Sequence, residues 1–321
     1  MVDTFLPIVQ RMLLFGGVLF LVGIGAWRSW IFPRLSLDPP VGDGPEPPPL
    51  GGRVARLGVA TILLVLLPAW GLRLYSQLLD FRDPFAPLSE DLSFLVWETF
   101  WGTVWIAQGV ILLGLVPLFI LLRRRGGGSG PLPLLWKLTW GGIILLLLTL
   151  SLSSHAMSVP YNRPLAVAVD ATHTAAAGAW IGSLALILLL HGPGWGIRMK
   201  GARPEGDGAL FAAQLRAFSP VAMVSVGVLV FMGLVLSSVH IGEFRNLWAS
   251  SYGRVLSLKI LLAGGVMLLG AVNWRRGLPV LDSESGRRAV HRRAGLEVVL
   301  ALAVLAATAV LVGTTMPEGV H

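Results

Sequence analysis

Residues 134–154 have the sequence LLWKLTWGGIILLLLTLSLSS, an apolar run long enough to cross the hydrocarbon core of a bilayer, about 30 Å thick. Similar runs recur along all 321 residues of the chain, which is 55% hydrophobic and only 13% charged. Too few charged residues remain to cover a soluble domain of this length. Because the runs are continuous, rich in leucine and without apolar–polar alternation, they predict membrane-spanning helices rather than the strands of a closed barrel.

The predicted fold is therefore an all-α, polytopic transmembrane helical bundle of about eight spanning helices. A proline-rich segment at 35–52 and a glycine-rich segment at 126–131 read as linkers, and no separate soluble domain is expected. We divide the chain into an N-terminal four-helix membrane half, 1–150, and a C-terminal four-helix membrane half, 151–321. The predicted spans are 12–32, 57–79, 96–122, 134–154, 165–190, 217–240, 256–274 and 295–315, with ends placed to within a few residues.

Basic residues predict the orientation of these helices. Loops after the first, third, fifth and seventh predicted spans hold 18 of the 25 Lys and Arg residues, and the opposite loops hold five. The positive-inside rule then places the 18-residue side in the cytoplasm and both termini outside. The acidic segment 80–91 falls on the outer side. The net charge of +8 is thus explained by topology, and no nucleic-acid partner is expected.

Composition also narrows the chemistry. The chain has no cysteine, which excludes disulfides, thiolate catalysis and cysteine metal sites. There is no glycine-rich phosphate loop, and no nucleophile, base and orienting acid converge in the sequence. The protein is therefore not expected to be an enzyme, and any transport would be passive or coupled to an ion gradient.

Asp170 and His173 are polar residues within the fifth predicted span, three residues apart and so on one helical face. An unpaired carboxylate within a span costs on the order of 3 kcal/mol or more, so Asp170 is expected to face protein or water. The small residues at 175–179 would let another helix approach closely. A hydrogen bond from the imidazole to Asp170 would orient the ring of His173.

Further candidate ligands fall in the same outer layer although they belong to different helices. His155 and Met157 end the fourth predicted span, and His240 ends the sixth. Imidazole and thioether are the ligands that a copper site uses without cysteine, and carboxylate adds a preference for Cu(II). The candidate copper ligands are therefore His155, Met157, His173, His240 and Asp170, whereas each histidine or methionine taken singly also fits an interfacial or packing residue.

At these positions the chain resembles the CopD family of bacterial inner-membrane copper resistance proteins, from about residue 154 to residue 317. The family usually has glycine at the positions of Ser154 and Ser183. The resemblance implies movement of copper across the cytoplasmic membrane, often with a periplasmic copper-binding protein as partner. It rests on Ser154-His155-Ala156, Asp170-Ala171-Thr172-His173, Trp180-Ile181-Gly182, Phe218-Ser219-Pro220, Gly233, His240, Tyr252-Gly253-Arg254-Val255-Leu256, Lys259, Asn273-Trp274-Arg275, Glu297 and Met316-Pro317.

Copper transport, with uptake from the periplasmic side, is thus the function expected in copper resistance and homeostasis, and Asp170 is a candidate proton carrier. Two alternatives remain open. The histidines could bind haem b in a membrane redox or cofactor-assembly protein. They could also be incidental to a non-catalytic subunit or scaffold.

Overall fold

The computed structural model describes residues 2–35, 50–125, 132–154, 162–191, 204–241 and 250–314, and all regular structure in these segments is helical. Eight helical stretches are long and apolar enough to cross a membrane, and they confirm the eight predicted spans. The elements are α1 (Val2–Ala26), η1 (Trp27–Ile31), η2 (Phe32–Arg34), α2 (Leu50–Thr61), η3 (Ile62–Leu66), α3 (Leu67–Phe81), α4 (Leu88–Trp97), α5 (Phe100–Arg125), α6 (Leu132–Ser151), α7 (Arg163–Ala177), η5 (Gly178–Gly182), α8 (Ser183–His191), α9 (Pro204–Ile241), α11 (Ser251–Val272), η6 (Asn273–Gly277), η7 (Leu278–Val280) and α12 (Glu284–Leu311).

Short π-helical segments interrupt several spans without ending them. They are η1 at the end of α1, η3 between α2 and α3, η5 between α7 and α8, and η6 after α11. A π turn inserts one residue and rotates the side chains that follow it relative to a regular α-helix. Regular periodicity therefore does not describe which side chains face inward beyond these points.

The last span is longer than predicted, because α12 begins at Glu284 and not near residue 295. Ser283 caps the helix, since its Oγ accepts a hydrogen bond from the backbone N–H of Gly286 at 3.1 Å. The arginines at 287–293, which we expected in a loop, thus lie on the first turns of α12. Similarly, α9 begins at Pro204 rather than near residue 217. Hydropathy missed both starts because these first turns are polar.

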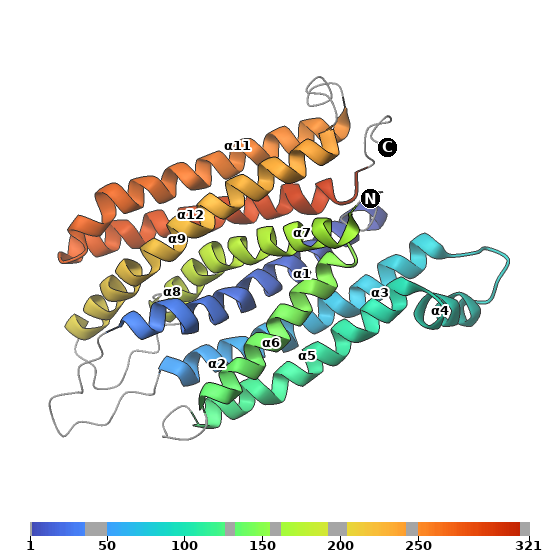
Figure 1. Cartoon of the computed structure of the whole chain (residues 1–321), viewed down its shortest axis with the longest axis horizontal. Coiled ribbons are helices and arrows are strands. Elements are labelled where there is room, and N and C mark those ends of the chain that lie inside the picture. The colour runs from blue at the N-terminus through green and yellow to red at the C-terminus, as the bar shows by residue number, and fades with distance from the viewer. Residues whose placement is uncertain are drawn as a thin grey trace.

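The spans form three groups that run roughly parallel in Figure 1. The pair α11 and α12 packs together with α9 on one side, and α2, α3, α5 and α6 lie on the other. Between them lie α1 and the continuous span α7–η5–α8. Helix α1 contacts elements of both outer groups, including α3, α6 and α12, so it forms the centre of the bundle.

The closest approach of two spans joins α1 to η5. A Cβ added to Gly23 would lie 2.1 Å from the carbonyl carbon of Gly182, and one added to Gly182 would lie 2.1 Å from the carbonyl oxygen of Leu19. Only glycine fits either position, as at other close helix crossings in membranes. Ser183 adds a buried hydrogen bond from its Oγ to the carbonyl oxygen of Gly23, 3.1 Å long.

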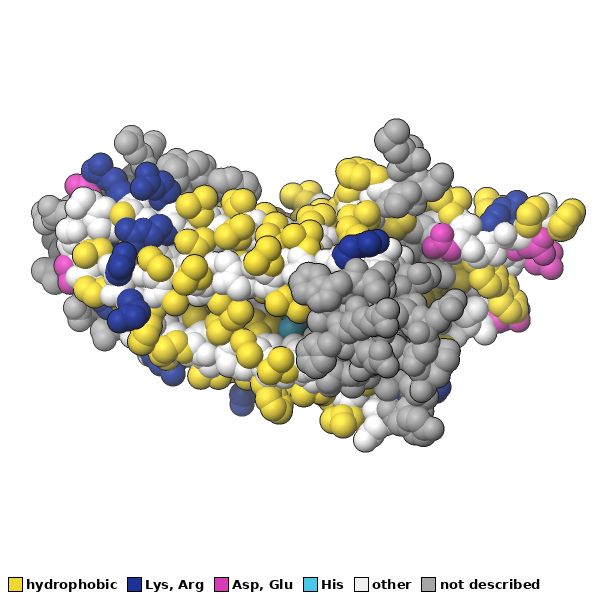
Figure 2. Space-filling view, turned by 90° about the horizontal axis from the view of Figure 1, so that it is seen from above, with side chains coloured by type: hydrophobic (Ala, Val, Ile, Leu, Met, Phe, Trp, Pro, Cys, Tyr) yellow, Lys and Arg dark blue, Asp and Glu magenta, His cyan; other side chains and the backbone are white. Residues whose placement is uncertain are grey.

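Many large apolar side chains point outward, including Leu64, Leu261 and Leu268, which are 76%, 73% and 68% exposed. A surface of this kind requires a bilayer around it. On the face seen in Figure 2, apolar side chains cover the middle, and most of the visible Lys and Arg side chains gather toward the left-hand end. We call this the basic end, where α9 and α12 begin, and the opposite end, which carries α4 and the start of α7, the acidic end.

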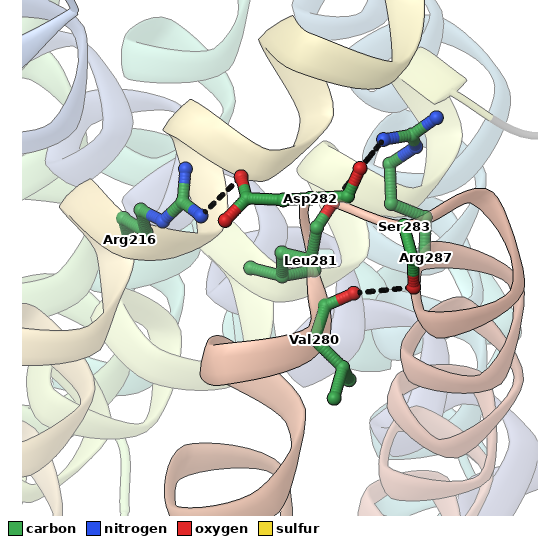
Figure 3. Close-up of polar contacts among 6 residues, drawn as sticks. All are labelled: Arg216, Val280, Leu281, Asp282, Ser283 and Arg287. Carbon is green, nitrogen blue, oxygen red and sulfur yellow. Dashed lines mark hydrogen bonds and ion pairs between the residues drawn. The ribbon is translucent and has the colours of Figure 1, made fainter.

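At the basic end, a polar clamp fixes the turn between the last two spans (Figure 3). Arg216 of α9 donates to the carboxylate of Asp282 at 2.7 Å. Arg287 of α12 donates to the carbonyl oxygens of Leu281 and Asp282, at 3.2 and 3.1 Å. A Cβ on Gly208 would lie 2.7 Å from the Arg287 Nε, so the start of α9 also rests on this arginine.

We expect the two arginines of the clamp to differ in their contribution to stability. The Arg216 and Asp282 side chains are 47% and 81% exposed, so Arg216→Ala should lower the free energy of unfolding by less than about 1 kcal/mol. Arg287→Ala removes charge-assisted bonds to two carbonyl groups and should cost about 2 kcal/mol. Melting temperatures of both variants in detergent test this order. Equal losses would show that the ion pair contributes more than its exposure predicts.

Candidate functional site

His173 lies on α7, in the half of the span nearer the acidic end, with a half-buried side chain. Its ring faces α9, where a Cβ added to Gly233 would lie 3.9 Å from the imidazole Cε1. The Nδ1 atom is buried and has no hydrogen-bond partner in the described part of the chain. A buried ring nitrogen without a partner is unfavourable in a bilayer, so this atom is available to a ligand.

Asp170 lies near His173 on the same helix but does not hydrogen-bond to it in the structure. Its Oδ2 instead accepts a hydrogen bond from the Ser154 Oγ, at 3.2 Å. The ammonium group of Lys259, on α11, interacts electrostatically with both Asp170 and His173. The hypothesis that Asp170 orients the imidazole is therefore not supported, and Lys259 is a counter-charge that the sequence did not indicate.

The structure does not describe the side chains of the other predicted ligands. His155 and Met157 lie outside the described residues, as does Met316. His240 belongs to α9, but its side chain is outside the described part of the structure. Its backbone lies seven residues beyond Gly233, which is about 10 Å farther along the helix toward the acidic end. Among described residues, no group of three or more His, Asp and Glu side chains is placed to hold a metal ion.

A second polar centre, which the sequence analysis missed, surrounds Glu297 near the middle of α12. The side chain is 3% exposed. Its Oε1 accepts a hydrogen bond from the Trp180 Nε1 and its Oε2 one from the Asn273 Nδ2, each 3.1 Å long. The predicted span 295–315 would put Glu297 on the first turn of its helix, whereas α12 begins at Glu284, more than three turns earlier. The signal available in the sequence was a carboxylate within a long apolar segment.

Beside Glu297 lies a cavity of about 270 Å³ between α9, α11, α12 and the α7–α8 span. Its walls are mainly apolar, and they include two thioethers, Met223 of α9 and Met267 of α11. Trp180, Asn273 and Glu297 also line it. The cavity is therefore lined by one carboxylate, one amide and two thioether side chains, with Met223 51% exposed.

The two remaining described histidines, His191 and His291, lie toward the basic end. The His191 Nε2 is 3.3 Å from the Gln214 Nε2, and the Gln214 Oε1 accepts a hydrogen bond from the Trp27 Nε1 at 3.2 Å. Because the amide nitrogen can only donate, His191 accepts through Nε2. Phe211 contacts His191 and His291, with ring centroids 5.4 and 5.7 Å away. This cluster is separate from the His173 region.

Comparison with known proteins shows two matches to family models. Residues 1–159 match the model described as "Copper resistance protein D-like, N-terminal domain", and residues 212–311 match "Copper resistance protein D". The chain belongs to the copper resistance protein D family. This confirms the resemblance found in the sequence and extends it to the N-terminal half.

One curated relative is the "Copper transport protein CutJ" of Bacillus subtilis (strain 168). It is 27% identical to this chain over 284 residues, which cover 84% of this chain and 45% of the relative. The chain thus spans about half the length of the relative that it matches. No solved structure matches the chain significantly.

The two serines that depart from the usual family pattern both have a structural role here. Ser154 donates from its Oγ to Asp170, and Ser183 donates from its Oγ to the carbonyl oxygen of Gly23. Glycine could form neither bond. The first departure bears on the candidate site, because the single hydroxyl proton of Ser154 is shared between the Asp170 carboxylate, at 3.2 Å, and the carbonyl oxygen of Ser151, at 2.9 Å.

Proposed function

We propose that this protein carries copper across the bacterial inner membrane, taking it up from the periplasmic side. Membership of the copper resistance protein D family and the name of the Bacillus subtilis relative support copper as the cargo. The observation that carries the proposal is the buried, unpartnered Nδ1 of His173 next to a carboxylate within a span. An imidazole nitrogen in this state is a ready copper ligand.

We infer the orientation from the charge distribution. The basic end gathers the arginines that end α5 and begin α12, which is the pattern of cytoplasmic loops. The acidic end, with α4 and the start of α7, would then face the periplasm together with both termini. His173 lies in the half of the membrane nearer that side, where an ion arriving from the periplasm, or from a periplasmic copper-binding protein, enters first.

Capture at this level would use Asp170 and His173 together with His155, Met157 and His240, which the sequence places in the same layer. The buried ammonium of Lys259, on α11, is a positive charge close enough to Asp170 to attract its carboxylate. An arriving cation competes with Lys259 for the carboxylate. Binding is therefore weaker than at a site of free carboxylates, which suits transfer rather than storage.

Substitution of His173 provides the test. We expect His173→Ala, purified in detergent and exposed to copper, to bind at least one copper ion fewer per chain than wild type. In proteoliposomes it should take up copper at least tenfold more slowly. His191→Ala, which changes a histidine near the basic end whose Nε2 already has Gln214 as a partner, is the matched control and should retain the bound ion. Metal analysis by mass spectrometry and a visible spectrum provide the measurements.

The same experiment separates the alternatives. Equal copper content and uptake in wild type and His173→Ala would contradict the proposed capture site. A Soret band that is present in wild type and absent in His173→Ala would show that His173 binds haem b and not copper. If wild-type protein binds neither copper nor haem and transports no copper, the proposed function is wrong.

A further inference from the structure

The carboxylate of Glu297 is buried between helices, and no ion pair joins it to a cation in the described part of the chain. Both of its oxygens accept hydrogen bonds from neutral groups, the indole N–H of Trp180 and the amide of Asn273. No ion pair of Glu297 occurs among the described residues. A charged carboxylate at this depth is costly unless a cation neutralises it. The two neutral donors orient the group but supply no opposite charge.

Asn273 also presents an unused acceptor at this place. Its Nδ2 donates to Glu297, whereas its Oδ1 is buried and has no hydrogen-bond partner among the described residues. An unpaired buried carbonyl oxygen costs about 1–3 kcal/mol, so natural proteins rarely keep one without a reason. A cation bound beside Glu297 would satisfy both the carboxylate and this oxygen.

Two π-helical segments bring the partners of Glu297 together. Trp180 belongs to η5 and Asn273 is the first residue of η6, and these segments come from spans five and seven. Single π turns within α-helices occur frequently at functional sites, because they redirect side chains at a cost to regular hydrogen bonding. Here two of them converge on a single carboxylate of a third span.

Sulfur ligands complete the surroundings. Met223 and Met267 line the same cavity as Glu297, with Met267 partly buried and Met223 at the rim, 51% exposed. Thioether sulfur prefers Cu(I) over hard cations and over Cu(II). One carboxylate and one monovalent ion also give a neutral site, whereas a divalent ion would leave a net positive charge in the membrane interior.

We propose that this cavity is a second, intramembrane site for a soft monovalent cation, Cu(I), with Glu297, Asn273, Met223 and Met267 as its ligands. The proposal rests on the copper transport proposed above. Glu297 lies near the middle of α12, whereas His173 lies nearer the acidic end. An ion that moves inward from the His173 layer would therefore reach this cavity next. The ion keeps its oxidation state during this transfer, and no redox partner is needed.

The test separates the two sites by substitution. Leucine conserves the volume of methionine without its sulfur, so Met223→Leu/Met267→Leu should fold normally. We expect wild-type protein to bind Cu(I) at two sites in competition with a chromogenic Cu(I) chelator. The double variant and Glu297→Gln should each weaken one of them at least tenfold. Met12→Leu, in α1 and outside the cavity, is the matched control and should bind as wild type does.

X-ray absorption of the bound copper provides a second measurement. In a His173→Ala background, copper at the cavity should show sulfur neighbours, which Met223→Leu/Met267→Leu removes. Unchanged binding and unchanged sulfur scattering in the double variant would overturn the cavity site. If wild-type protein still transports copper in that case, only this inference fails. If wild type neither binds nor transports copper, the proposed function fails with it.

Discussion

Gly182→Ala is expected to lower the free energy of unfolding by about 3 kcal/mol or more. The new Cβ would lie 2.1 Å from the carbonyl oxygen of Leu19 and 3.1 Å from the Cα of Gly23. Both atoms belong to the backbone of α1, so no side-chain rotation relieves the clash. Overpacking of this kind typically costs 1–3 kcal/mol and exceeds that range where backbones must separate.

A second glycine provides the control for this substitution. Gly264 lies in α11, and a Cβ added there meets no atom within 4 Å. Gly264→Ala should therefore change stability by no more than about 1 kcal/mol, in the stabilising direction, because alanine favours the helix. Thermal unfolding in detergent, followed by size-exclusion chromatography, compares the two. A Gly182→Ala protein that melts with the wild type would disprove the close α1–η5 contact.

The second large effect is expected from the charges around His173. Asp170→Asn leaves the ammonium of Lys259 within a span without its carboxylate, at a cost of about 3 kcal/mol. Lys259→Met alone leaves Asp170 uncompensated and should cost a similar amount. Asp170→Asn/Lys259→Met removes both charges, so its stability should return to within about 1 kcal/mol of wild type. Thermal unfolding of the four proteins gives the coupling between the two residues.

Copper content distinguishes the role of the pair from its contribution to stability. If Asp170 is a ligand, the stable double variant should still lose the copper ion that His173→Ala loses. Lys259→Met should bind that ion more tightly than wild type, because it removes the competitor for the carboxylate. Additive stability losses in the double variant would show that the two charges do not interact.

The number and order of the spans followed from the sequence, because a bilayer requires long apolar runs and this chain contains eight of them. The ends of the helices were predicted less well from the sequence. The first turns of α12 are rich in arginine, so hydropathy assigned them to a loop, whereas the Ser283 cap makes them helical. Side-chain capping is a local signal that a hydropathy window averages out.

The candidate site was predicted in part for a related reason. The positions of Asp170 and His173 on one helix face follow from a spacing of three residues. Their partners on other helices do not, since nothing in the periodicity of α7 indicates that Lys259 or Gly233 lies opposite. Glu297 shows the same limit. Its meaning depends on Trp180 and Asn273, which two π turns direct toward it and which regular helical spacing would place elsewhere.

The central position of α1 has a consequence for how the chain is made. Helix α1 is synthesised before the other described spans, yet its glycines are covered by residues that are synthesised much later. Contacts of its glycine positions occur with Leu66, Trp140, Gly182 and Leu305, in that chain order. Spans inserted later therefore pack against a helix that is already in the membrane. A C-terminal half synthesised alone would lack α1, against which its first span, α7–η5–α8, packs.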